Sequence, residues 1–109
     1  MKSIIIAAVA VSALSGAAQA ASNVTDIQFL QAARCRGLAA SESLGRLDTA
    51  AIDQLLRTEG QARELAVRAS ATNKINAART QGDKAQGAKK EKLLAEREQT
   101  CAGWLQGAP

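Results

Sequence analysis

The sequence predicts an all-α fold, a small antiparallel helical hairpin or three-helix arrangement that is stapled by one disulfide. Apolar residues recur at the three- and four-residue spacing of amphipathic helices, and strand-like alternation does not occur. The single proline, Pro109, is the last residue, so no proline interrupts a helix. The two cysteines, Cys35 and Cys101, fall in the first and the last of the predicted helices.

The first 20 residues have the features of a cleavable secretory signal peptide, in the usual order. Lys2 supplies a positive charge, Ile4 to Leu14 is an uncharged apolar run, and Ala18-Gln19-Ala20 is an A-x-A cleavage site. The run is far shorter than the roughly 20 apolar residues of a membrane-spanning helix. We therefore expect an exported protein, periplasmic or secreted, without stable membrane insertion. Its mature chain would be one small domain, residues 21–109.

Local signals place the first predicted helix from Asp26 to Ala40. Thr25 and Gln28 match a capping box, in which each side chain accepts a hydrogen bond from the other residue's backbone. The apolar residues of this segment share one face, and Cys35 lies at the edge of that face. Residues 41–46, which include Gly45, are expected to form a connection.

The second predicted helix begins after Asp48, its expected N-cap, and continues to about Thr80. Leu47 and Ile52 stand at the two positions of a hydrophobic staple. Gly60 lies inside this segment and weakens the helix by about 1 kcal/mol relative to alanine. Apolar residues farther along this segment lie outside its apolar face, and they indicate a bend or a second contact surface.

Residues 81–88 are the expected hinge, since they include Gly82 and Gly87. Asp83 would then cap a third helix that runs from Lys84 to Leu105. In the alternative, the hinge does not break and the second and third segments form one long helix. The lysines near the start of the third segment favour that alternative, because they oppose the positive end of a helix dipole.

The cysteine pair predicts an intramolecular disulfide between Cys35 and Cys101. An even number of cysteines in an exported chain is typical of disulfide bonding. The chain-entropy model assigns such a bridge roughly 4 kcal/mol of stabilisation. A redox-active pair and an intermolecular bridge are the alternatives. The sequence leaves open whether the helices pack within one chain or in a homodimer.

Four charged residues, Arg34, Glu59, Arg63 and Arg97, project within about 60° of the centre of otherwise apolar stripes. Glu59 and Arg63 are also spaced as an i,i+4 pair. One interpretation is that their stems lie along the core and their charged ends reach water. A sharper hypothesis is that Glu59 meets Arg34 or Arg97 between helices and fixes the register. A third is that these charges line the rim of a ligand groove.

Four lysines, Lys84, Lys89, Lys90 and Lys92, form a candidate anion-facing patch. The alternative is a solvated helix face, since Glu91 and nearby glutamates dilute the charge. No aromatic residue interleaves with the lysines for base stacking, so we expect no nucleic-acid partner. The formal net charge is +4, and it becomes +3 when Lys2 is removed with the signal peptide. This mild basic bias favours anionic partners without identifying one.

The composition excludes most kinds of catalytic site. The chain has no histidine and no tyrosine, and it lacks phosphate-binding loops and calcium-binding motifs. We therefore predict no catalytic site, no cofactor site and no metal site, and expect that the protein is not an enzyme. The leading hypothesis is an exported protein that acts through protein–protein interaction. The alternatives are a binder of anionic surfaces through the four lysines, or a stress chaperone. In its general plan, a short exported helical domain with one disulfide, the chain is similar to the periplasmic acid-stress chaperones.

Overall fold

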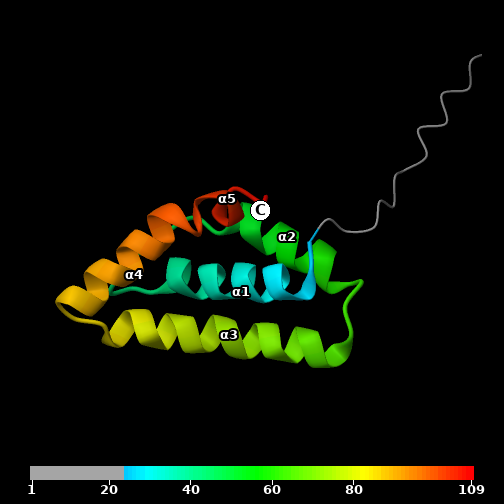
Figure 1. Ribbon diagram of the computed structural model, residues 1–109, viewed down its shortest axis with the longest axis horizontal. Helices are drawn as coiled ribbons and strands as arrows, with labels where there is room; N and C mark the ends of the chain where they lie inside the picture. Colours follow the sequence, from blue (N-terminus) through cyan, green and yellow to red (C-terminus); the bar gives the residue numbers. More distant parts are fainter. Residues whose placement is uncertain (1–23) are drawn as a thin grey trace, which may run out of the picture.

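The computed structural model describes residues 24–109, which form five helices and no strand (Figure 1). They are α1 (Asp26–Ala40), α2 (Ala50–Gly60), α3 (Leu65–Lys84), α4 (Ala88–Gln99) and the short α5 (Ala102–Leu105). The predicted fold class is confirmed, and the Cys35–Cys101 disulfide is present. The predicted signal peptide lies outside the described residues.

Helix α1 is the centre of the arrangement. Helices α1, α2 and α3 alternate in direction, so α3 runs parallel to α1 along one of its sides (Figure 1). Helices α2, α4 and α5 cover the other side. The core is built around α1 and its neighbours, and its buried residues include Phe29, Leu38, Ile52 and Trp104.

The start and end of α1 agree with the prediction. The amide of Gln28 donates to the Thr25 hydroxyl at 3.1 Å, and the amide of Thr25 donates to the Gln28 side chain at 3.0 Å. This reciprocal pair satisfies two backbone donors that the first turn of a helix otherwise leaves unpaired.

Helices α1 and α3 approach very closely at Gly37. A Cβ atom at this position would lie 2.2 Å from the carbonyl oxygen of Ile75 and 2.7 Å from the Cβ of Ala78. Ala71 and Ala78 on α3 are also buried. Small residues therefore allow the two backbones to approach each other, and only glycine fits at position 37.

The prediction of one helix from Asp48 to about Thr80 is wrong, because the chain turns between α2 and α3 at residues 61–64. Gly60 ends α2 against the ring of Phe29, and a Cβ atom at position 60 would lie 3.6 Å from the nearest ring atom. The turn lets α3 lie along α1, which a straight continuation of α2 would not do. The N-cap position of α2 is Thr49 and not Asp48, although the Asp48 carboxylate accepts from the Ala50 amide at 2.9 Å.

The expected break between the second and third segments is present, so the alternative of one long helix is excluded. Helix α3 ends at Lys84 and α4 begins at Ala88, with Gly87 at φ +57° in the turn. Such a backbone conformation is readily adopted only by glycine. Gly82 lies inside α3, where a Cβ would be 2.7 Å from the Ser41 hydroxyl oxygen.

The predicted third helix is also divided, into α4 and α5. Helix α4 ends at Gln99 and α5 begins at Ala102, and between them Cys101 meets Cys35 with a Cα–Cα distance of 5.4 Å. Both cysteines are buried, at 1% and 0% exposure. The disulfide therefore ties the middle of α1 to the junction of α4 and α5. Its two cysteines are 66 positions apart, for which the chain-entropy model gives about 4 kcal/mol.

The close approach at Gly37 predicts a large difference between two glycine substitutions. Gly37→Ala forces α1 and α3 apart, and overpacking of this kind costs about 1–3 kcal/mol. Gly60→Ala is the matched control, because its Cβ meets only the Phe29 ring at ordinary contact distance. It should be neutral or stabilise by up to about 1 kcal/mol through helix propensity. Urea unfolding of the two variants measures both effects, and equal stabilities would contradict this account of the α1–α3 contact.

Candidate functional site

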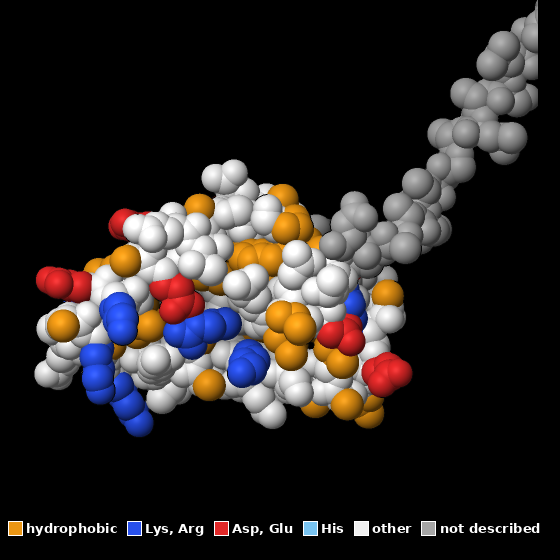
Figure 2. All heavy atoms as spheres, in the orientation of Figure 1, with side chains coloured by type: hydrophobic (Ala, Val, Ile, Leu, Met, Phe, Trp, Pro, Cys, Tyr) orange, Lys and Arg blue, Asp and Glu red, His pale blue; other side chains and the backbone are white. Residues whose placement is uncertain are grey.

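A groove lies between the end of α3 and α4. Its volume is about 780 Å³, and α1 contributes Arg34 to its lining. Figure 2 shows lysine and arginine side chains gathered at this end of the molecule. The groove is lined by Arg34, Gln81, Lys84, Ala85, Lys89, Lys92, Leu93, Ala95, Glu96 and Gln99.

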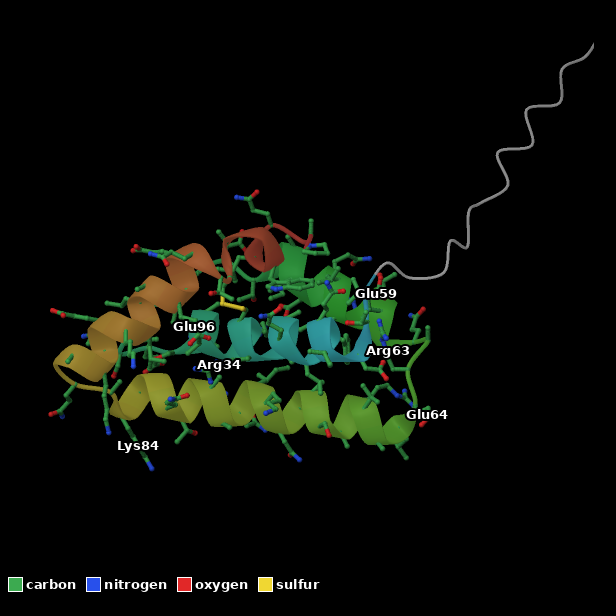
Figure 3. All side chains as sticks on the ribbon, viewed as in Figure 1. Arg34, Glu59, Arg63, Glu64, Lys84 and Glu96 are labelled. Atoms are coloured by element: carbon green, nitrogen blue, oxygen red, sulfur yellow. A yellow bond between two sulfur atoms is a disulfide. The ribbon has the colours of Figure 1, made fainter. Side chains whose placement is uncertain are left out.

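A fixed ion pair, Arg34 with Glu96, forms part of the groove wall. Nε and Nη2 of Arg34 donate to the two carboxylate oxygens of Glu96 at 2.6 and 2.9 Å, and Nη1 donates to Gln81 at 2.9 Å (Figure 3). The hydrogen bond to Glu96 raises the pKa of Arg34. A two-pronged contact of this kind is geometrically specific. It holds α1, α3 and α4 in register around the groove.

Three lysines supply the positive charge of the groove that no nearby carboxylate balances. Lys84 comes from the end of α3, and Lys89 and Lys92 come from the start of α4. No described carboxylate lies within ion-pair distance of any of them. Four lining cations against the one carboxylate of Glu96 give a formal charge of +3. Lys90, the fourth lysine of the predicted patch, is partly buried and does not line the groove.

The start of α4 adds to the positive potential. Its N-cap residue is Gly87, which has no side chain to accept from the first amides of the helix. The helix dipole places partial positive charge at the same end. Lysines in this turn cost helix stability, and Glu91 is the only acidic residue there. Residues that reduce the stability of their own helix, as these lysines do, are expected where they serve a function.

An apolar strip runs beside the charges. Leu93 is buried, Ala85 and Ala95 are partly buried, and all three line the groove. The groove can therefore make apolar contacts as well as attract negative charge. Binding sites of this composition hold a ligand by its apolar surface and orient it by a few polar groups.

The predicted network in which Glu59 meets Arg34 or Arg97 is not the arrangement found. Arg34 pairs with Glu96, and Glu59 contacts Arg63 at the opposite end of α1 (Figure 3). The turn at residues 61–64 is the reason, since it brings Arg63 back over the start of α1. Arg63 there contacts Asp26 at 2.6 Å, the Val24 carbonyl, and the Phe29 ring at 5.3 Å from its centroid.

Arg97 is buried and binds backbone carbonyls. Its guanidinium donates to Gly45 at 2.6 Å, to Leu44 at 2.8 Å and to Leu38 at 3.3 Å. Burial lowers the pKa of Arg97. The side chain satisfies carbonyls at and beyond the end of α1, so its role is to hold the connection between α1 and α2 against α4.

Asp83 joins the end of α3 to the same connection, a contact that the sequence analysis missed. Its Oδ1 accepts from the Ser41 hydroxyl at 2.8 Å and from the amides of Glu42 and Ser43 at 3.0 and 3.4 Å. The Ser41 hydrogen bond is the largest cause that lowers the pKa of Asp83 below its ordinary value. The predicted role of Asp83 as a cap for α4 is therefore wrong, because the residue lies within α3.

The described residues contain no group of three or more His, Cys, Asp or Glu side chains placed to hold a metal ion. None of the helices of residues 24–109 is long and apolar enough to cross a membrane. No protein-family model, curated protein or solved structure matches the chain.

The Asp83 contact predicts a pH-dependent stability. Since the folded pKa of Asp83 lies below the unfolded value of about 3.9, its contribution is present above that value and is lost as pH falls through the folded pKa. The melting temperature of the wild-type protein should exceed that of Asp83→Asn at pH 7, and the difference should be smaller at pH 3, which lies below the unfolded value. Thermal unfolding followed by circular dichroism checks this, and a constant difference at both pH values would contradict it.

Proposed function

We propose that this is an exported, non-enzymatic protein that binds an acidic segment of another protein in the groove between α3 and α4. The observation that carries the proposal is the set of three lysines without carboxylate partners, Lys84, Lys89 and Lys92, beside an apolar strip. Negative side chains would meet the lysines, and apolar side chains of the same segment would contact Leu93 and its neighbours.

The shape of the site favours a peptide segment over a flat anionic surface. The lysines stand around a groove in which Arg34 and Glu96 lie at the wall, so a flat surface would not reach the apolar strip. Lysine is a flexible point charge, and three lysines can adjust to carboxylates that are spaced irregularly. Binding by such exposed charges should weaken as salt is added.

Binding can be tested with the oxidised mature protein and a short peptide of Glu, Asp and Leu, by calorimetry at low salt. Lys89→Glu with Lys92→Glu should weaken binding at least about ten-fold, because it reverses the charge of two groove residues. Lys74→Glu with Lys90→Glu is the matched control, since it changes net charge equally but neither residue lines the groove. The control variant should bind within about two-fold of the wild type.

Three results would contradict the proposal. The first is no binding of the peptide at low salt. The second is equal loss in both double variants, which would indicate unspecific charge attraction. The third is tight binding to vesicles of anionic phospholipid, lost in Lys89→Glu with Lys92→Glu, when the peptide does not bind. That result would establish a binder of anionic surfaces instead.

Export rests on the signal-peptide pattern of the first 20 residues, and a buried disulfide fits an oxidising compartment. When the full chain is expressed in a bacterium, the mature protein should be recovered from the periplasm, with an N-terminus at Ala21. Its mass should be that of the oxidised protein, two hydrogens below the reduced form. Intact-mass analysis of periplasmic and cytoplasmic fractions measures both, and full-length protein confined to the cytoplasm would contradict export.

A further inference from the structure

A second groove lies between α2 and α3, over a face of α1 turned away from Arg34. Its volume is about 310 Å³, and its apolar floor includes Phe29 of α1, Leu56 of α2 and Ile75 of α3. A neighbouring hollow of about 460 Å³ shares Leu56 and Ile75 and extends the groove toward Arg36 and Asp53.

The groove exists because α2 and α3 each pack on α1 and diverge from one another. In Figure 1 they lie on opposite sides of α1. Small residues leave the space open, since Gly60 and Ala71 line it where larger side chains would fill it. On α3, the lining residues Arg68, Ala71 and Ile75 recur at helical spacing, so one stripe of this helix faces the groove.

Two arginines stand on opposite walls, Arg57 on α2 and Arg68 on α3. Both are exposed, and no described carboxylate lies within ion-pair distance of either. Within residues 24–109, the guanidinium of Arg57 donates to the neutral side chain of Gln54, at 2.8 Å, and to no carboxylate. By contrast, Arg36 at the end of the groove pairs with Asp53 at 2.5 Å. The uncompensated positive charge is thus concentrated beside the apolar floor.

We propose that this groove binds an anionic amphiphile with a single alkyl chain, of the class of fatty carboxylates. The carboxylate would lie between Arg57 and Arg68, and the alkyl chain would lie along Phe29, Leu56 and Ile75. A guanidinium presents paired donors that match the two oxygens of a carboxylate. Apolar contact with the alkyl chain supplies the remaining affinity.

The size of the groove favours this ligand over a partner helix. A volume of about 310 Å³ is at the small end of the range for small-molecule sites. The proposal concerns a different groove and a different ligand from the proposed function, so either can fail without the other.

The test uses the oxidised mature protein and decanoate below its micelle concentration, followed by calorimetry and amide chemical shifts. From hexanoate to decanoate, each added methylene should tighten binding by roughly three- to four-fold. Arg57→Gln with Arg68→Gln should weaken decanoate binding at least about ten-fold. Arg46→Gln with Lys74→Gln is the matched control, because it removes the same charge from exposed residues that do not line this groove.

We expect the two grooves to bind their ligands independently. Lys89→Glu with Lys92→Glu should leave decanoate binding unchanged, and the arginine double variant should leave binding of the acidic peptide unchanged. The proposal is overturned if decanol or decyltrimethylammonium binds as tightly as decanoate, if affinity is independent of chain length, or if the arginine double variant binds normally. It is also overturned if the acidic peptide, and not decanoate, shifts the amides of α2 and α3 around this groove.

Discussion

The structure depends on the close packing of α3 against α1. At Gly37 the two backbones are so near that a single added carbon would lie 2.2 Å from the carbonyl oxygen of Ile75. The contact uses small residues, so it contributes little apolar area per residue and relies on proximity and fit. It also determines where the other helices pack. Because α3 covers one side of α1, helices α2, α4 and α5 pack on the opposite side. The small core is then reinforced by the buried disulfide, in keeping with the general need of short chains for a staple.

Both grooves follow from this arrangement. A helix that packs on α1 from one side and a helix that packs from the other diverge from each other, and their side chains leave space between them. Polar contacts hold the walls of the first groove, through Arg34 with Glu96, and the connection beside it, through Arg97 and Asp83. The lysines and arginines proposed for binding have no such contacts with the carboxylates of residues 24–109. The charged residues thus divide into those that hold the scaffold and those that are left available for a ligand.

Features with a local cause could be predicted from the sequence. The capping box set the start of α1, Gly87 marked the turn before α4, and two cysteines after a predicted signal peptide indicated one bridge. A bend in the second segment was one of two interpretations of its apolar residues, but the end of α2 could not be located. Gly60 alone costs a helix little, and the turn is stabilised by contacts of Arg63 with residues near the start of α1. The lysine patch was visible because its members are neighbours in sequence. Arg34 and Glu96 are 62 positions apart, and their pairing depends on how three helices pack.

The position of the disulfide bears on the order of events when the protein is made. Cys35 lies in α1, whereas Cys101 comes after α2, α3 and α4. In a chain exported from its N-terminus, Cys35 would reach the oxidising side while nearly all of α2, α3 and α4 had still to follow. The bridge could close only after Cys101 had crossed as well, 66 residues later. Until then Cys35 would be a lone thiol, open to mixed disulfides with other proteins, so the speed of export would set how long that exposure lasts.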